Sequence, residues 1–365
     1  MMKLQNNKTI ASLCRKSNLV AKIVALLLCS FVALPSLAQV VEGTSYYLPK
    51  TAMRFTLLVE KTVFVPGEMC GYAQRYLKKS VGQEPATTYR LLSTTMNTFA
   101  VPDTAKRHTL IMDRRLSIGN VERTDDGILL AINARPLSLP EPSHFVAKPK
   151  AAPLNARDYM NEDILTAGST AKMAALIAQE IYDIRDSRNQ LQRGQAEFMP
   201  TDGQQLRIMM EGLDRQERAL RQMFEGTTTI DTTEVVVEYV PTKVVDRELL
   251  FRFSRYFGLV DADDLSGEPY YVSVALDQPF AEEAAADAQK KQKDDIGLWV
   301  NMPARIKVKL IRGTQPLYSY DFNAGQFGRT EVLSGALFGR KQTCRIVLNP
   351  LTGGIESIKE DNLEH

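Results

Sequence analysis

The sequence has few of the residues that build metal and redox sites. Its 365 residues include four cysteines, three histidines and one tryptophan. The histidines, His108, His144 and His365, lie in separate segments, and none has a second ligand at the spacing of a zinc site. The patterns of serine hydrolases, phosphate-binding loops and dinucleotide-binding turns are also missing. We therefore expect no catalytic residue, no metal site and no cofactor.

The cysteines leave two alternatives open. Cys14 and Cys29 lie in the N-terminal leader described below, which leaves Cys70 and Cys344 in the rest of the chain. In an oxidising compartment these two could form one disulfide. Each could equally be a separate small buried thiol.

Long hydrophobic runs are missing after the N-terminus. A membrane-spanning helix needs about 20 apolar residues, and the longest run, 23–34, is shorter. It lies within residues 1–38, which carry five basic residues and no acid and end in Pro35-Ser36-Leu37-Ala38. This pattern predicts a secretory signal peptide over 1–38, cleaved after Ala38. We expect an exported protein in the periplasm or at the outer membrane, with no transmembrane span in the mature chain.

The charge of the mature chain is nearly balanced. Loss of the leader lowers the number of Lys and Arg residues from 45 to 40, against 43 Asp and Glu residues. A slightly acidic chain lacks the basic surface with which proteins bind nucleic acid. We expect no nucleic-acid partner.

Alternating apolar residues predict an N-terminal β-rich domain over 39–135. An Asp126-Gly127 turn signals a hairpin in it, and Pro102-Asp103 is expected to end a strand. The elements expected in this domain are strands over 46–65, 89–101 and 110–121 and one short helix over 68–79.

Residues 136–156 predict a linker, because they hold five prolines. Over 157–226, apolar residues recur at helical spacing and predict two long helices that form a hairpin. Gly194 and Gly226 are expected to end these helices. Closely spaced strands over 227–365 indicate a second β-rich domain, built as a sandwich or barrel. The predicted fold class is α+β, with the antiparallel helical hairpin between two β-rich domains.

The outer face of the predicted hairpin is rich in charged side chains. Such a face is either ordinary solvated surface or a docking surface for a partner. The arginines of the candidate docking face are Arg185, Arg188, Arg193, Arg215 and Arg218.

One tripeptide suggests a modification. Asp103-Thr104-Ala105 follows a proline in an expected loop. It resembles the short O-glycosylation signal of secreted proteins from Bacteroidetes-type bacteria. Thr104 could therefore carry a glycan, and the alternative is an ordinary loop residue.

Several segments together resemble an uncharacterised family of secreted proteins from Bacteroides-type bacteria, known only as a domain of unknown function. The resemblance spans nearly the whole mature chain. It implies an envelope location and a β-rich build with a helical hairpin, and it implies no reaction. The segments are YYLPKT (46–51), the helix around 164–188, the helix end at 217–226, WVNMPARIKV (299–308), Gln326-Phe327-Gly328 and 348–353.

Three functions stay open at this point. The first is a non-enzymatic envelope scaffold or adaptor with protein partners, which predicts an exposed apolar or charged patch on the hairpin or on a sheet edge. The second is a module that binds a glycan or small ligand, which predicts that Trp299 and several tyrosines line a groove. The third is a hydrolase with two facing carboxylates.

Overall fold

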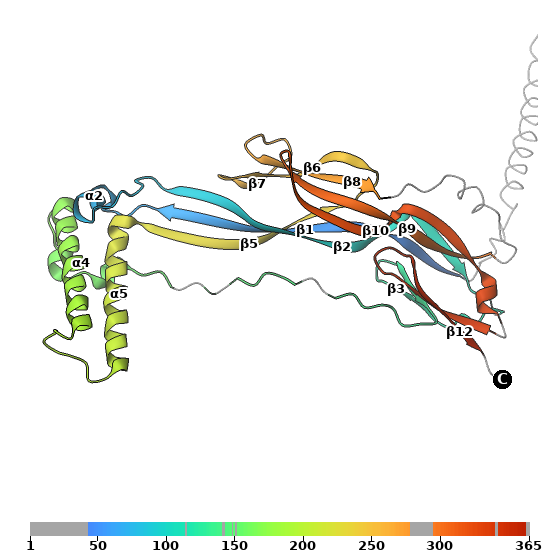
Figure 1. The fold of residues 1–365 in the computed structure, drawn as a ribbon, viewed down its shortest axis with the longest axis horizontal. Coiled ribbons are helices and arrows are strands. Elements are labelled where there is room, and N and C mark those ends of the chain that lie inside the picture. Colours follow the sequence, from blue (N-terminus) through green and yellow to red (C-terminus); the bar gives the residue numbers. More distant parts are fainter. Residues whose placement is uncertain are drawn as a thin grey trace, which may run out of the picture.

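The molecule is elongated, with its two longest described helices at one end and its last strand at the other (Figure 1). The computed structural model describes residues 43–113, 115–140, 143–147, 149, 152–277, 295–339 and 342–362. About half of this part of the chain lies in three antiparallel sheets. The predicted leader and His365 lie outside the described residues. So does all but the last residue of the Ala-, Lys- and Asp-rich segment 282–295, whose composition predicts a short exposed helix or a flexible connector.

Sheet A forms the long axis of the molecule. It has the strand order β2 (Ala86–Ile111), β1 (Gly43–Val65), β5 (Thr227–Tyr239). Along β1 the buried side chains alternate with partly exposed ones, as in Met53, Phe55 and Leu57, so the strand predicted over 46–65 is confirmed.

Sheet C packs against this apolar face of sheet A. The two inner faces share a core in which Met53 and Phe55 of β1 contact Val272, Ile306 and Val308. Sheets A and C therefore form a sandwich. The strand order of sheet C is β10 (Gln315–Ser334), β9 (Asp295–Arg312), β8 (Glu268–Leu276), β6 (Val245–Ser254), β7 (Gly258–Val260).

Sheet B lies at the end opposite the helices (Figure 1). The turn between β3 and β4 contains Gly127 with a φ of +83°, which confirms the predicted hairpin. Sheets A and B each join strands from the two segments predicted as separate β-rich domains, 39–135 and 227–365. The domain boundaries themselves stay a prediction. The order of sheet B is β12 (Ile355–Asn362), β11 (Gln342–Leu348), β4 (Leu129–Ile132), β3 (Val121–Arg123), and the short helix η4 (Gly335–Phe338) precedes β11.

Two strand predictions in the N-terminal region are wrong. Pro102-Asp103 does not end a strand, because β2 continues to Ile111. The chain accommodates the proline with a wide bulge: Pro49 of β1 pairs with Pro102, but Tyr47 pairs with Arg107. The strand predicted over 110–121 is also absent, since β2 ends at Ile111 and β3 begins at Val121.

The predicted hairpin is confirmed, but not its place between two β domains. Helices α4 and α5 cap one end of the molecule (Figure 1). The reason is that α5 leads directly into β5, whose first residue, Thr227, pairs with Val65 at the end of β1. No described helix is both long and apolar enough to cross a membrane. The described helices at this end are η1 (Cys70–Tyr72), α2 (Ala73–Tyr76), η2 (Ala156–Tyr159), α3 (Glu162–Leu165), α4 (Thr170–Arg193) and α5 (Gly203–Glu225).

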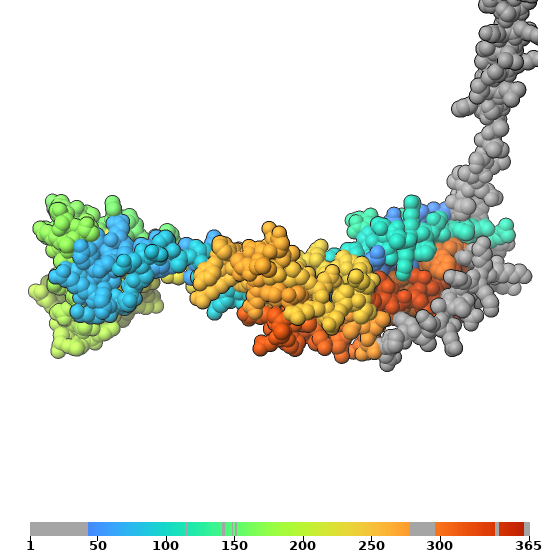
Figure 2. Space-filling view, turned by 90° about the horizontal axis from the view of Figure 1, so that it is seen from above, coloured from blue at the N-terminus to red at the C-terminus, as the bar shows by residue number. Residues whose placement is uncertain are grey.

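A narrow neck joins these helices to the sandwich. The strands of sheet A run through this neck, which is visible in the space-filling view (Figure 2). The helix predicted over 68–79 at the end of the neck is shorter than expected, because only Cys70–Tyr76 is helical, in η1 and α2. The described part of residues 136–155, which we call the strap, has no helix or strand and runs beside sheet A (Figure 1).

Candidate docking surface

The helical hairpin begins and ends at capping residues. The Ser169 side chain accepts a hydrogen bond from the Lys172 N–H at 3.3 Å, and Gly194 follows α4 with a φ of +68°. Asp202 accepts a hydrogen bond from the Gln205 N–H at 2.7 Å at the start of α5. These contacts satisfy backbone groups that a helix end leaves free. The hairpin is thus fixed by local sequence.

The helices at this end have their own apolar core, and we call the whole assembly from η1 to α5 the helical tip. Ile177 and Ile181 of α4 and Leu220 and Phe224 of α5 are fully buried in it, together with Ala73 of α2. Each large side chain contributes about 1.5–3 kcal/mol on burial. This core is separate from the core of the sandwich.

Two arginines of the predicted docking face hold the hairpin together. Glu217 of α5 is only 5% exposed, and its carboxylate accepts hydrogen bonds from Arg185 at 2.7 Å and Arg188 at 2.8 Å. Arg188 also donates to Asp214 at 2.9 Å, and this bond is the main reason that its pKa is raised. Arg185 and Arg188 are therefore held against the neighbouring helix, with side chains 32% and 28% exposed, and their role in docking stays a prediction.

The other three arginines of the predicted face lie on the surface. Arg193, Arg215 and Arg218 are exposed. Arg218 also donates to the backbone oxygen of Asp214 at 3.1 Å. Their role in docking stays a prediction.

The free end of the hairpin bears an apolar patch, whose residues the sequence pattern did not single out. We define this patch by Phe198 and Met199 in the loop, 79% and 44% exposed, and Ile208 and Met209 of α5, 58% and 42% exposed. Met209 follows the helical spacing of the apolar residues in α5 but is exposed, as no residue in the first half of this helix is buried. A cluster of exposed apolar side chains marks an interaction surface.

Two glycines fix the tip on the neck. Gly226 has a φ of +75°, and a Cβ there would lie 2.2 Å from the backbone oxygen of Val65. A Cβ at Gly67 would lie 2.2 Å from the backbone oxygen of Met223. Only glycine allows the backbones to approach this closely.

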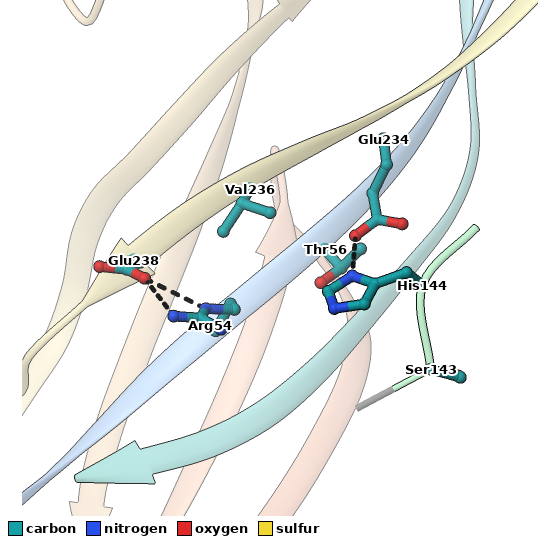
Figure 3. Close-up of a pocket in the computed structure, with 7 residues that line it drawn as sticks. All are labelled: Arg54, Thr56, Ser143, His144, Glu234, Val236 and Glu238. Atoms are coloured by element: carbon teal, nitrogen blue, oxygen red, sulfur yellow. Dashed lines mark hydrogen bonds and ion pairs between the residues drawn. The ribbon is translucent and has the colours of Figure 1, made fainter. Parts of the chain in front are cut away.

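A surface cavity of about 260 Å³ lies between sheet A and the strap (Figure 3). Its acids are paired: Glu238 accepts hydrogen bonds from Arg54 at 2.8 and 3.1 Å. Glu234 lies 3.7 Å from His144 Nδ1 and accepts a hydrogen bond from the Phe145 N–H at 2.8 Å. These contacts fasten the strap to β5 and bring no reactive pair together.

The single tryptophan lies among core rings at the end opposite the helical tip. Trp299 is half-buried and stacks on His108, which in turn lies 5.7 Å from the ring of Tyr46. Tyr46 is fully buried. Burial lowers the pKa of His108, whose Nε2 is buried without a hydrogen-bond partner among the described residues. The arrangement lends no support to a sugar-stacking groove.

The two cysteines are far apart. Cys70 lies in η1 at the helical tip, and Cys344 lies buried in β11 at the opposite end of the molecule (Figure 1). They form no disulfide with each other, because a bridge requires Cα atoms within about 7 Å. Of the two alternatives that the sequence left open, the structure has separate thiols.

The tripeptide around Thr104 lies on the wide bulge of β2. Thr104 is exposed, whereas Asp103 is 4% exposed and its carboxylate lies 2.9 Å from Lys50 Nζ. The Asp103 carboxylate also accepts a hydrogen bond from the Ala105 N–H at 3.2 Å. The bulge therefore holds the Thr104 side chain outward in a fixed turn.

A family model for a domain of unknown function, DUF4831, matches residues 42–356. The chain belongs to the DUF4831 family. No curated protein matches the chain, and neither does any solved structure.

Four of the segments on which the resemblance rested meet at one junction of the DUF4831 domain. Thr51 exchanges two hydrogen bonds of 2.9 Å with the Gln326 side chain, and its hydroxyl donates to the Leu351 backbone oxygen at 2.9 Å. The Asn301 N–H donates to the Gly353 backbone oxygen at 3.0 Å. The contacts of Thr51 join β1 to β10 and to the turn before β12. The contact of Asn301 joins β9 to the same turn. The motifs thus hold the sheets together.

Proposed function

We propose that this DUF4831 protein is an exported, non-enzymatic scaffold or adaptor of the cell envelope that acts through protein–protein contacts. The observation that carries the proposal is the helical tip, which projects from the sandwich on a narrow neck and bears the apolar patch at its free end. The neck thus holds the apolar patch of the helical tip away from the sandwich. The leader-like residues 1–38 support export.

The surface at the tip combines features of protein interfaces. Phe198 and Ile208 are more than half exposed, and burial of apolar side chains is the main source of binding free energy. Arg215 and Arg218 on the same helix add exposed positive charge. Arginine and large apolar residues are typical of interface hot spots.

The test is purification of the tagged full chain from its native envelope after mild crosslinking. A stoichiometric partner is expected, and it should be lost when Phe198→Ser is combined with Ile208→Ser. The matched control is Lys309→Glu, which changes an exposed residue of β9 in the sandwich. A partner retained by the tip variant, or no partner in repeated preparations, would overturn the proposal.

A second candidate function is small-ligand binding, which one cavity favours. A pocket of about 410 Å³ adjoins the junction described above. It is lined by apolar side chains, such as Phe322 and Leu351, and by polar ones, such as Asn301 and Asn323. This mixture is common in ligand sites. A screen of glycans and metabolites by thermal shift tests it, and Asn323→Leu should abolish any shift found.

We also propose that Thr104 is O-glycosylated in the native envelope. The support is its exposed position on the bulge and the tripeptide that it shares with the glycosylation signal. Intact-mass measurement of the native protein tests the proposal, since Thr104→Ala should lose the mass of a glycan. A mass that falls only by the difference between threonine and alanine would overturn it.

A further inference from the structure

Strand β10 lies at one edge of sheet C and carries a row of aromatic rings. Tyr318 and Tyr320 pair with Leu310 and Val308 of β9, two side chains that are fully buried in the sandwich. Directly paired residues of neighbouring strands point to the same side of a sheet. Both tyrosines therefore lie on the inner face of sheet C, the face that packs against sheet A.

The row is open to solvent at its start. Tyr318 is 44% exposed, although its partner Leu310 is fully buried, and Tyr320 is half-buried. The ring centroids of the two tyrosines are 6.2 Å apart, and the ring planes are tilted by 32°. The two rings thus form an accessible apolar strip at the edge of the sandwich.

The row leads to the pocket of about 410 Å³ beside the junction, which we call the junction pocket. Phe322 follows Tyr320 by two positions in β10, so it lies on the same side of the sheet. It lines the junction pocket together with Thr98 of β2. Alternate residues of a strand lie about 6.6 Å apart, so the three rings form one strip that ends in the pocket.

The polar side chains of the junction pocket include hydrogen-bond acceptors that are not fully used. Glu356 is exposed and accepts a hydrogen bond from Asn349 Nδ2 at 3.4 Å, and a carboxylate can accept several more. The Oδ1 atom of Asn301 is buried without a hydrogen-bond partner among the described residues. Its Nδ2 atom donates to the backbone oxygens of Pro49 and Thr352 at 3.1 and 2.8 Å. Buried polar atoms normally have partners, so the pocket suits a ligand rich in O–H donors.

The charge of the junction pocket narrows the class of ligand. Glu356 is the one ionisable side chain among the described residues that line it, so a carboxylated or sulfated chain would be repelled. A sugar ring has an apolar C–H face that can stack on the negative face of a tyrosine ring. We propose that the aromatic row and the junction pocket bind a neutral oligosaccharide, whose rings stack on Tyr318 and Tyr320 and whose hydroxyl groups bind in the pocket. The proposal rests on the second candidate function, small-ligand binding, and names the class of ligand.

A proline-rich peptide is the main alternative, because such peptides also dock on rows of exposed aromatic rings. Prolines carry no backbone N–H, so a polyproline chain presents carbonyl acceptors. Glu356 and the Asn301 Oδ1 atom are acceptors as well. Two sets of acceptors form no hydrogen bonds with each other, so the pocket favours the oligosaccharide.

Titration calorimetry with defined probes tests the site on the purified protein. The probes are four neutral hexasaccharides, derived from cellulose, xylan, mannan and chitin, together with a hexamer of galacturonic acid and a ten-residue polyproline peptide. At least one neutral hexasaccharide should bind with a dissociation constant of about 1 mM or tighter, and the acidic hexamer at least about tenfold more weakly. No binding by any neutral hexasaccharide, or binding of polyproline in their place, would overturn the proposal.

Variants of β10 locate the site. Tyr318→Ala should weaken binding of the hexasaccharide at least about tenfold, because a stacking ring is lost, whereas Tyr318→Phe keeps the ring and should bind as the unchanged protein does. The matched control is Tyr256→Ala, which removes a 63% exposed tyrosine from the turn between β6 and β7 and should leave binding unchanged. All three variants should keep the circular dichroism spectrum of the unchanged protein. Full binding by Tyr318→Ala would overturn the proposal.

The proposal and the function on which it rests can fail separately. The thermal-shift screen includes metabolites that need no stacking ring. A metabolite whose binding depends on Asn323 but not on Tyr318 would support small-ligand binding in the junction pocket and would overturn the oligosaccharide site. Neither result affects the crosslinking test of the adaptor function.

Discussion

Replacement of Glu217 by alanine should destabilise the helical tip strongly. The carboxylate is 5% exposed and accepts hydrogen bonds at 2.7 and 2.8 Å from Arg185 and Arg188. Its removal leaves two half-buried guanidinium groups on α4 without this acceptor. Breaking a buried charge pair costs about 3–5 kcal/mol, and we expect about 3 kcal/mol here because both arginines keep partial contact with water.

The matched control is Glu211→Ala on the same helix. Glu211 and Arg207 form an exposed pair at 3.6 Å, and such a pair contributes about 0.5 kcal/mol or less. In urea unfolding followed by helical circular dichroism, a loss of about 3 kcal/mol should lower the midpoint by about 1–3 M, given typical slopes of 1–3 kcal/mol/M. Equal midpoints for the two variants would refute the view that Glu217 joins the two helices.

Three further outcomes follow from the same contacts. Gly226→Ala should destabilise the protein by more than about 2 kcal/mol, because the backbone there is left-handed and a Cβ would lie 2.2 Å from the Val65 backbone oxygen. Gly212→Ala is the control: a Cβ there meets no atom within 4 Å, and the change should stabilise the helix by about 1 kcal/mol. Thermal unfolding of the two variants measures both effects. Burial lowers the pKa of His108 below its ordinary 6.5 in the folded state, so the unfolded chain binds more protons and the free energy of unfolding should fall as the pH drops below 6.5. His108→Phe should flatten this pH dependence in urea titrations from pH 5 to 8. An unchanged pH dependence in the variant would contradict the prediction. N-terminal sequencing of the exported protein should begin at Gln39, and a retained leader would disprove cleavage.

Local signals in the sequence predicted much of the fold. Gly194 marks the end of α4, the alternation in 46–65 marks β1, and Gly127 marks the hairpin. Each depends on a few neighbouring residues, so no tertiary contact was needed to find it.

The rest depends on contacts between distant segments. The pairing of β1 with β5 carries the hairpin to one end of the molecule, and no local pattern reveals which strands pair. The same limit holds for two arginines of the predicted docking face, because the contacts of Arg185 and Arg188 with Glu217 join residues about 30 positions apart. Pro102 seemed a strand end because the bulge that accommodates it requires the partner strand.

The most direct test of the adaptor account is site-specific photo-crosslinking in the native envelope. A photoreactive residue at position 208, in the apolar patch, should give one discrete adduct with a partner protein. The same residue at position 309 on the sandwich should give none. No adduct at 208, or the same adducts at both positions, would contradict the claim that the helical tip is the docking surface.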